Sequence, residues 1–561
     1  MKISKKLILF LGFVGFFLLA AKAFAVPACP KLFEIHQPDG TVFLARAFGD
    51  EWYSGMETAE GYAILKEPST GYWVYALKDS SGGLYPSSLV VGIDAPTGIP
   101  KHLRDDFALQ RMASHVLPDY TKGKKIVGDY PILVLLVEFK NQKLVGSTPS
   151  DWKKQFFGSK GSVKAYFDEV SYGQLNIIPA RENQAPEYDT AKNDGIVKVK
   201  VKMKHPNSGG NTGDDNRKIV KKALEAADKS VNFSKLDKND DGAISNDEAS
   251  IIVVCAGYEA SYGGSNAKQP NVWGHKWTLG WGAVSAPILD GVLVADWLSG
   301  GGYAQFGEWH ARIGDSPLSI QIGGHLATIG IMIHELGHLA LGLPDLYDTD
   351  GSSDGVGKWC IMGGGGWNSA APYFGDSPPL PAYSGDTPAH PSAWCKYFVQ
   401  WIKPKVWNKG SKKFPLNQIE TAKKKSLYLV GNNPNGAEFG GEGEYFLLEN
   451  RQKVGFDKGL PGFGLLIWHI DETKSNNKQE GHTKSTHRLV DLEEADGRND
   501  LDSVGARGDK GDPFPGSANQ KQFTNKTKPH SKSYSGKDSK VRVKNISNSK
   551  KKMTAKISGN K

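Results

Sequence analysis

Residues 331–348 of this 561-residue chain are IMIHELGHLALGLPDLYD, and this stretch predicts a buried helix with a metal site. Gly342, with Pro344 two residues later, is a common way to end a helix. His334 and His338 are four residues apart, so both imidazoles project from one helix face. Apolar residues recur at the spacing of a largely buried helix: Leu326, Ile329, Ile331, Met332, Ile333, Leu336, Leu339 and Leu341.

Two imidazoles on one face predict a shared zinc ion, because zinc binds histidine nitrogens at about 2.0–2.1 Å. Glu335 points beside the ion, where it can accept a proton from water that zinc has acidified. Without a metal, three polar groups in an apolar helix would be buried without partners, which is costly. His325 precedes His334 by nine residues and falls on the opposite face, so we expect a structural or surface role for it.

A catalytic zinc needs a third protein ligand and one open position. A glutamate from the next helix is disfavoured here, because no glutamate occurs between Glu335 and Glu420. The alternative is a ligand just after the glycine that ends the helix, as in the metzincin pattern, where a histidine is usual. Asp345 stands near that place, and Asp348 is the competing ligand.

The motif HELGH followed by GLPDLYD resembles the secreted bacterial metallopeptidases of the immune inhibitor A family. Two later stretches resemble the same family: GKWCIMGG at residues 357–364 and DTPAHPSAW at residues 386–394. The resemblance implies a metzincin-like fold in which Met362 forms a hydrophobic floor beneath the zinc. It also implies that the protein is a zinc-dependent peptidase.

The chain departs from the family pattern by one inserted residue. The family has its glycine three residues after the second histidine, whereas Gly342 lies four residues after His338 and Asp345 seven residues after it. We expect a helical bulge or a later exit from the helix to absorb the insertion. Because the Gly-x-Pro-Asp context is retained, the resemblance favours Asp345 over Asp348 as the third zinc ligand.

Residues 237–248, DKNDDGAISNDE, match the calcium loop of the EF-hand. The candidate calcium ligands are Asp237, Asn239, Asp241, Ala243 through its carbonyl, and Glu248. The following residues predict a buried strand rather than a second EF-hand helix, so a lone calcium loop is expected. The alternative is an acidic Asx-rich turn without metal. Asp348, Asp350 and Asp354 form a weaker second calcium candidate.

Stabilisation of a developing oxyanion needs a hydrogen-bond donor near the metal. His390, Tyr347 and Tyr373 are candidates, although each residue type is more often structural. His469 lies in a strand-like stretch and is expected to be a packed histidine.

The four cysteines of the chain give a further expectation: an exported chain with four cysteines is compatible with one or two disulfides. These are Cys29, Cys255, Cys360 and Cys395, and Cys29 is also a candidate zinc ligand in a latent form.

Residues 1–25 have the features of a signal peptide, with Lys2, Lys5 and Lys6 before an apolar run and Ala23-Phe24-Ala25 at the expected cut. The apolar run is short for a membrane core of about 30 Å, so we expect secretion and no stable membrane span after cleavage. Removing residues 1–25 lowers the formal net charge from +9 to +5. This mild charge gives no signal for nucleic-acid binding.

The rest of the chain divides into three predicted parts. Residues 26–120 alternate strands with turns and resemble the family's N-terminal pro-segment, expected to assist folding and to block the cleft until it is cut. Residues 121–403 combine a buried strand at 130–139 with helices and predict an α+β catalytic domain. Residues 404–561 predict a β-rich, sandwich-like C-terminal domain.

Together these features predict a secreted zinc endopeptidase that hydrolyses peptide bonds in proteins, with Glu335 as general base. The alternative is a calcium-stabilised surface or adhesion protein with a non-catalytic zinc site. The presence of Glu335 argues against it, because a purely structural metal needs no base. A zinc amidase acting on cell-wall peptides is a weaker third possibility.

Overall fold

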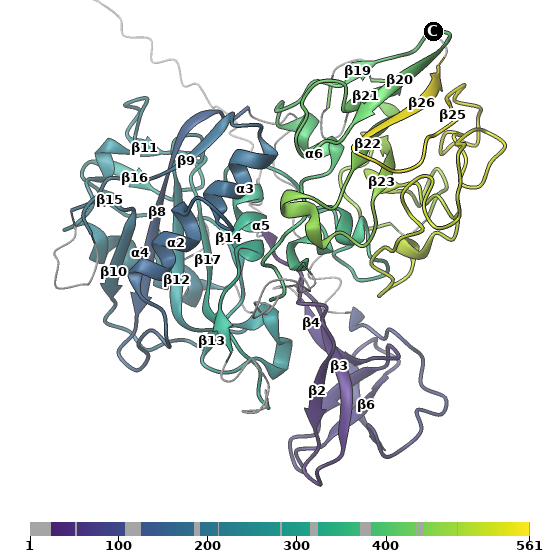
Figure 1. The fold of residues 1–561 in the computed structure, drawn as a ribbon. Helices are drawn as coiled ribbons and strands as arrows, with labels where there is room; N and C mark the ends of the chain where they lie inside the picture. The colour runs from purple at the N-terminus through teal and green to yellow at the C-terminus, as the bar shows by residue number, and fades with distance from the viewer. Residues whose placement is uncertain are drawn as a thin grey trace, which may run out of the picture.

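The computed structural model describes residues 24–50, 53–106, 125–183, 191–210, 213–280, 283–314, 324–370, 383–433, 436–437, 441–479 and 481–559. In these ranges a small N-terminal sheet, a larger domain of sheet and helices, and a β-rich C-terminal part follow one another (Figure 1). Most of the expected signal peptide, residues 1–23, lies outside the described ranges.

The larger domain is built on a nine-stranded mixed sheet. Six strands lie side by side in the order β1 (Phe24–Ala25), β14 (His275–Trp277), β17 (Tyr303–His310), β12 (Ser250–Glu259), β8 (Gly128–Glu138) and β10 (Ile196–Lys200). Three more strands pair with these: β9 (Leu175–Pro179), β13 (Asn271–Val272) and β18 (His325–Leu326). β17, β12, β8 and β10 run parallel, whereas β14 is antiparallel to β17, and β1 is antiparallel to β14.

Helices cover both faces of this sheet, because its strands are apolar on both sides. Along β8, Ile132 and Val134 pack in one core cluster and Leu133 and Leu135 in another. The first cluster contains residues of α2 (Pro149–Phe157), α3 (Val163–Val170) and α5 (Ile329–Leu339). The second contains residues of α4 (Asp214–Ala227). The predicted strand at 130–139 is confirmed by β8, and the predicted α+β class is confirmed in the coarse sense of a mixed sheet with a few helices.

The N-terminal sheet is an antiparallel meander whose six strands pair in sequence order. They are β2 (Phe33–His36), β3 (Val42–Gly49), β4 (Ser54–Thr58), β5 (Ala63–Lys66), β6 (Trp73–Lys78) and β7 (Leu84–Val90). The chain does not enter this sheet directly, since β1 first pairs with the central sheet of the larger domain. The last two residues of the predicted signal peptide therefore pair with the larger domain, and Val26, the first residue of the predicted pro-segment, is buried in its core.

The C-terminal part is β-rich, as predicted, and consists of two sheets. The larger sheet contains β19 (Lys405–Val406), β21 (Leu427–Asn432), β22 (Glu444–Arg451), β23 (Gly464–Asp471) and β24 (Val490–Leu492). The smaller contains β20 (Ser411–Asn417), β26 (Lys552–Ser558) and β25 (Arg542–Lys544). In β22, Phe446 and Leu448 belong to the core between these sheets, whereas Tyr445 and Leu447 belong to the core that contains α5. One face of the larger sheet therefore packs against the smaller sheet, and its other face packs in the core that contains α5.

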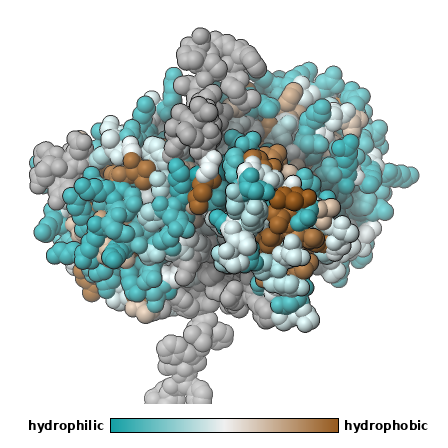
Figure 2. Space-filling model, turned by 90° about the horizontal axis from the view of Figure 1, so that it is seen from below, coloured by the Kyte–Doolittle hydropathy of each residue, from teal (hydrophilic) through white to brown (hydrophobic). Residues whose placement is uncertain are grey.

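Shorter elements complete the described fold. A three-stranded sheet contains β11 (Ala243–Ile244), β16 (Val292–Val294) and β15 (Ile288–Leu289), and one further helix is α6 (Ala393–Phe398). The 3₁₀ helices are η2 (Phe233–Lys235), η3 (Ala260–Tyr262), η4 (Gly264–Asn266), η5 (Gly357–Trp359), η6 (Gly364–Trp367), η7 (Gly455–Gly459) and η8 (Asp500–Asp502). None of the described helices is long and apolar enough to cross a membrane. Seen from below, the described surface is mostly hydrophilic with a few hydrophobic patches (Figure 2).

Candidate metal centre

The centre is built on α5, a helix whose residues are all buried. Thr328 is its N-cap and Ala340 its C-cap, so the helix begins at Ile329, inside the apolar run. It packs against β17, β14 and β1 of the central sheet. This burial explains the continuous run of apolar residues, and it leaves the polar residues of the helix facing the protein interior.

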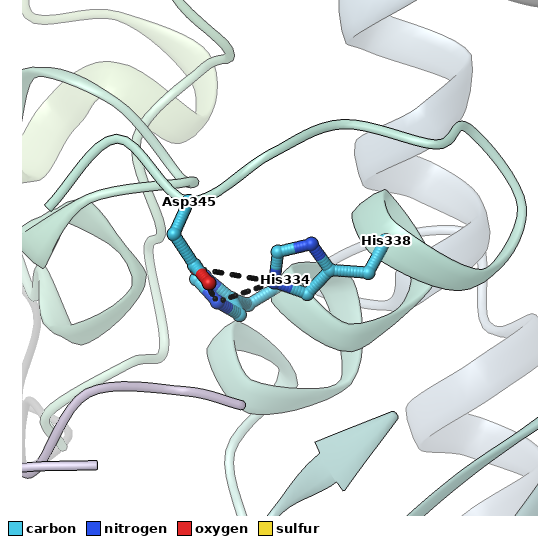
Figure 3. Close-up of side chains that lie close together, drawn as sticks. All are labelled: His334, His338 and Asp345. Atoms are coloured by element: carbon cyan, nitrogen blue, oxygen red, sulfur yellow. Dashed lines mark hydrogen bonds and ion pairs between the residues drawn. The ribbon is translucent and has the colours of Figure 1, made fainter. Parts of the chain in front are cut away.

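His334, His338 and Asp345 lie around one point (Figure 3). The Nε2 atoms of His334 and His338 are 3.1 Å apart. Oδ1 of Asp345 lies 3.2 Å from Nε2 of His334 and 3.2 Å from Nε2 of His338. Three donor atoms from the helix and the loop after it therefore form a nearly equilateral triangle.

The triangle fits a tetrahedral zinc ion. A tetrahedral ion with bonds of about 2.0–2.1 Å separates its ligand atoms by about 3.3 Å. Histidine nitrogens and carboxylate oxygens are common zinc ligands, and a tetrahedral ion with three such ligands keeps one position open for water or substrate. Burial lowers the pKa of His338, and Asp345 opposes this effect. A neutral imidazole is the form that binds a metal.

The second nitrogen of each imidazole fixes its orientation. Nδ1 of His334 lies 2.9 Å from the carbonyl oxygen of Ile361, and Nδ1 of His338 lies 2.7 Å from that of Leu343. A carbonyl only accepts, so each Nδ1 carries the proton and each Nε2 presents a lone pair to the centre. The resulting tautomers suit metal binding on both rings.

Met362 lies directly beneath the helix. A Cβ placed on Gly337 would come within 2.6 Å of the Met362 sulfur, so only glycine permits this close approach. The carbonyl of Met362 also accepts a hydrogen bond of 2.7 Å from the amide of Leu346, next to Asp345. Met362 thus packs against the metal helix, and its role as a floor beneath the zinc stays a prediction.

Glu335 is fully buried beside the donor triangle, and neither of its carboxyl oxygens has a hydrogen-bond partner among the described residues. Burial raises the pKa of this carboxyl well above its usual value, and Asp345 raises it further. The amide of Val26 acts in the opposite direction. Burial also lowers the pKa of Lys276 on β14 to about 8, which Glu335 opposes. An uncommitted carboxyl at this place is suited to proton transfer.

The inserted residue is absorbed where α5 ends. Gly342 has φ +63°, and its amide donates to the carbonyl of His338 at 3.1 Å. The amide of Leu343 then reaches back to the carbonyl of Gly337 at 3.0 Å, which closes a wide turn. Glycine adopts a positive φ without steric cost. The chain consequently leaves the helix in a direction that brings Asp345 to the histidines.

Asp348, the competing ligand, has other partners. Its Oδ2 accepts hydrogen bonds of 2.7 and 2.8 Å from the hydroxyls of Ser352 and Ser353. Burial raises the pKa of Asp348 to about 7, and Asp350 contributes to the rise. Asp348 is not part of the donor triangle formed by the two histidines and Asp345.

The oxyanion candidates have different positions. His390 lies in a buried charged cluster, with Nε2 2.8 Å from Glu169 and Nδ1 2.9 Å from Lys396. Both its nitrogens are thus engaged away from the centre. The ring of Tyr347 lies 6.3 Å from that of His334, and its hydroxyl donates to Asp50 of the N-terminal part at 3.2 Å. Tyr373 lies outside the described residues.

The predicted calcium loop connects η2 to β12. Its candidate ligands are Asp237, Asn239, Asp241, Ala243 and Glu248. Oε1 of Glu248 accepts from the amides of Lys238 and Asn239 at 2.7 and 3.1 Å, and Oδ2 of Asp237 accepts from Gly242 at 2.9 Å. Within the described part of the chain, the carboxylates of this loop do not converge as the His334 group does. The observed hydrogen bonds are those of an Asx-rich turn.

The expected disulfides are not present, since all four cysteines are free and buried. Sγ of Cys360 accepts from the amides of Met362 and Ser392 at 3.4 and 3.2 Å. Cys29 contacts the guanidinium of Arg312 rather than the metal centre. His325 is buried against aromatic rings in β18, before the helix rather than on its far face. His469 is packed between Glu444 and Glu493, as expected.

Three residues near the centre escaped the sequence analysis: Val26, Asp50 and Lys276. Each comes from a different segment: β1 leads to Val26 and pairs with the strand of Lys276, whereas Asp50 contacts Tyr347 after the helix. The alternation of the strands predicts which side chains are buried but not which strand lies at the edge beside the helix. No local pattern therefore identifies them.

Part of this chain is similar in sequence to known peptidases. Residues 122–378 match the family described as immune inhibitor A peptidase M6, catalytic domain. Immune inhibitor A of Bacillus thuringiensis subsp. alesti is 27% identical over 271 residues, which cover 42% of this chain and 36% of that protein. Pre-pro-metalloprotease PrtV of Vibrio cholerae serotype O1 (strain M66-2) is 30% identical over 280 residues, covering 45% of this chain and 26% of that protein. The chain thus spans about a third or less of these relatives. Residues 122–378 are therefore similar to the catalytic domain of immune inhibitor A peptidases.

Proposed function

We propose that this protein is a secreted zinc-dependent endopeptidase with His334, His338 and Asp345 as zinc ligands and Glu335 as general base. The observation that carries the proposal is the triangle of donor atoms, 3.1–3.2 Å on each side, next to a buried carboxyl whose oxygens have no hydrogen-bond partner in the part of the chain that the structure describes. The fold around it, with an antiparallel edge strand, a metal helix and a methionine beneath, favours a metzincin-like arrangement.

Each residue of the site has its own role in the proposed peptide hydrolysis. A zinc ion bound at the triangle supplies Lewis acidity, which polarises the peptide carbonyl and acidifies water. Glu335 takes the proton of the attacking water and passes it to the nitrogen of the leaving amine. The carbonyls of Ile361 and Leu343 keep both imidazoles in the tautomer that presents Nε2. Tyr347 is the candidate donor to the oxyanion, because the centre of its ring lies 6.3 Å from that of the His334 ring.

We also propose that residues 26–120 form a pro-segment. Asp50, from this part, holds the hydroxyl of Tyr347, and the carbonyl of Val26, its first residue, accepts a hydrogen bond from Trp273 of the larger domain. The name of the relative PrtV describes a pre-pro-metalloprotease, which favours a precursor for this chain. A full-length protein as active as its trimmed form would rule out latency. Secretion rests on the signal-like sequence of residues 1–25.

Calcium binding at residues 237–248 is a further proposal. Its support is the EF-hand pattern together with Glu248, which reaches back to the amides of Lys238 and Asn239 and so closes the loop. Calcium should then raise the Tm of the metal-free protein, and Glu248→Gln should remove that increase. An unchanged Tm with calcium would leave the loop as a hydrogen-bonded turn.

Digestion of casein tests the proposed function. The purified protein should cleave casein, a chelator should abolish the cleavage, and added zinc should restore it. Glu335→Ala should lose at least about 100-fold in activity, the range typical of general-base removal. An equally active Glu335→Ala protein would discard the mechanism, and cleavage of peptidoglycan fragments but not of casein would favour an amidase.

A further inference from the structure

The positive charge of the chain is concentrated at its C-terminal end. Residues 521–561 contain 13 lysines and arginines and a single acidic residue, Asp538, which gives a net charge of +12. Residues 404–520 contain 17 basic and 17 acidic residues, and residues 26–403 carry a net charge of −7. The mild charge of the whole chain is therefore the sum of one strongly basic segment and a mildly acidic remainder.

Part of this segment forms the outer sheet of the C-terminal part, in which β25 and β20 pair with the two sides of β26. Phe414, Met553 and Ile557 of this sheet are buried in the core that it shares with the larger sheet. Because side chains alternate along a strand, the residues between them point outward. The outward residues of β26 are Lys552, Thr554, Lys556 and Ser558.

Three lysines lie in one row across the outward side of the sheet. Lys556 of β26 is directly opposite Lys413 of β20 on one side and Lys544 of β25 on the other. All three side chains are exposed. Residues directly opposite one another have Cβ atoms about 4.5–5.5 Å apart, and like charges in such pairs destabilise a sheet. The row therefore opposes folding and indicates a role other than stabilising the sheet.

More lysines adjoin the end of this row. Lys552, also exposed, is opposite Asn417. The backbone amide of Asn417 donates to the carbonyl of Lys425 at 2.8 Å, and its side-chain amide donates to that of Lys424 at 2.9 Å. The amide of Gln418 donates to the carbonyl of Lys551 at 2.8 Å. The exposed lysines of two turns are thus held beside the end of the sheet.

The four outward lysines, Lys413, Lys544, Lys552 and Lys556, are called the basic face. Among the residues that the structure describes, no ion pair joins them to a carboxylate, since Asp538 pairs with Lys540 at 3.5 Å and with Arg542 at 2.8 Å. Their charges are therefore available to a partner.

Protection of the sheet edges does not account for the basic face. Lysines on edge strands discourage pairing with other chains, which would explain Lys413 on β20 and Lys544 on β25. Lys552 and Lys556, however, lie on β26, which is hydrogen-bonded to a strand on each side. A strand without a free edge needs no such protection, so the charge on β26 requires another explanation.

The chemistry of the basic face favours a surface of anionic lipid headgroups. Its four charges are all lysines, which bind phosphates as point charges without the fixed geometry of an arginine fork. The outward positions of β20, β25 and β26 carry no aromatic side chain, so these strands lack the stacking platform that single-stranded nucleic acid binds. Near an anionic membrane each basic residue strengthens binding about 5-fold.

We propose that the basic face binds the headgroups of anionic phospholipids and so attaches the protein to a membrane surface. The larger C-terminal sheet lies between this outer sheet and the core that contains α5. Figure 1 shows β25 and β26 on the outer side of the C-terminal part, away from α5. A membrane bound at the basic face therefore does not cover the candidate metal centre. The attachment is independent of the proposed peptidase function.

Co-sedimentation of the protein, purified after export, with lipid vesicles tests the proposal. Vesicles of phosphatidylcholine and phosphatidylglycerol in equal parts should bind the protein in 0.1 M NaCl, whereas vesicles of phosphatidylcholine alone should not. Because the Debye length falls from about 10 Å at 0.1 M to about 3 Å at 1 M, binding should be lost in 1 M NaCl. An absence of binding to the anionic vesicles, or binding that 1 M NaCl does not weaken, would overturn the proposal.

The triple variant Lys413→Gln/Lys544→Gln/Lys556→Gln removes the row of lysines. At about 5-fold for each lysine, its affinity for the anionic vesicles should fall about 100-fold. Its Tm should not fall, because three like charges in opposite positions are removed. Affinity within about 5-fold of that of the unaltered protein would overturn the role of the row.

The matched control is Lys202→Gln/Lys222→Gln/Lys229→Gln. It removes the same charge from three lysines of the larger domain that are also exposed. Its affinity for the vesicles should fall less than about 5-fold, because these lysines lie outside the basic face. Equal losses in the two triple variants would show that net charge alone drives the binding, and would overturn the proposal.

A DNA duplex of about 20 base pairs distinguishes lipid from nucleic acid as the partner. At the same salt and phosphate concentration, the protein should bind the duplex more weakly than the anionic vesicles, because a flat array of lysines has no base-reading side chain and no groove-shaped element. Tighter binding to the duplex, lost in the triple variant of the row, would assign the basic face to nucleic acid and overturn the proposal.

Discussion

The sulfur of Met362 packs against the backbone of Gly337, where a Cβ would lie only 2.6 Å from it. Gly337 stands between Glu335 and His338 on α5, and Met362 follows Ile361, whose carbonyl orients His334. The loop with the methionine and the metal helix therefore support each other through direct contact. A side chain at position 337 would displace the sulfur of Met362.

Gly337→Ala tests this contact. Alanine improves helix propensity by about 1 kcal/mol, but overpacking in a core costs about 1–3 kcal/mol, so the free energy of unfolding should fall slightly or not change. The displaced methionine should weaken zinc retention during dialysis. The double variant Gly337→Ala/Met362→Ala should retain more zinc than Gly337→Ala alone. Full zinc retention by Gly337→Ala alone would show that the contact does not matter for the metal.

Asp345→Asn and Asp348→Asn should differ in zinc content. Asp345 provides an oxygen 3.2 Å from both histidine nitrogens, whereas Asp348 binds serine hydroxyls. We expect Asp345→Asn to lower zinc affinity at least about 100-fold and Asp348→Asn to retain zinc, as measured by elemental analysis after dialysis. The opposite result would make Asp348 the ligand.

Tyr347→Phe should reduce kcat and leave KM nearly unchanged if the phenol stabilises the transition state. Removal of one such donor costs about 100–1,000-fold in kcat. Because Asp50 holds the hydroxyl at 3.2 Å, Asp50→Asn should weaken this restraint and raise the activity of the untrimmed protein. A Tyr347→Phe enzyme with unchanged kcat would exclude the phenol from catalysis.

The C-terminal sandwich should lose stability in alkaline solution through His469. Burial opposes its charged form, but hydrogen bonds to Glu444 and Glu493 raise the pKa of His469 to about 9. Since this lies above the pKa of about 6.5 in an unfolded chain, the stabilisation is fully present below about pH 6.5 and is lost as pH rises towards 9. The contribution is about 3 kcal/mol at most. His469→Gln should therefore flatten the fall in Tm between pH 6.5 and 9, and an unchanged slope would contradict the assignment.

The sequence predicted the parts of the site that depend on local spacing. His334 and His338 share a helix face because a helix repeats every 3.6 residues, and Met362 was placed through the family resemblance. Spacing alone did not separate Asp345 from Asp348, because the choice depends on how Gly342 redirects the chain after α5, and only the family resemblance favoured Asp345. The glycine provides the positive φ, but the direction of the exit follows from packing on Gly337 and Met362.

The sequence did not predict contacts between segments that are far apart in the chain. The pairing of Ala25 with His275 joins residues 250 positions apart, and it brings Val26 to Glu335. The sequence predicted a β-rich C-terminal part, but not that Tyr445 and Leu447 of β22 would extend the core around α5. The predicted disulfides are not formed: all four thiols are free, including Cys360 and Cys395, whose side chains share a hydrogen bond.

The central claim is that the two imidazoles and Asp345 hold zinc while Glu335 remains free to transfer protons. The most direct test is the zinc content of Glu335→Gln, measured on the same sample as its peptidase activity. The account predicts one zinc ion per chain, as in the unaltered protein, with at least about 100-fold less activity. A Glu335→Gln protein that lost its zinc, or that kept both zinc and full activity, would contradict it.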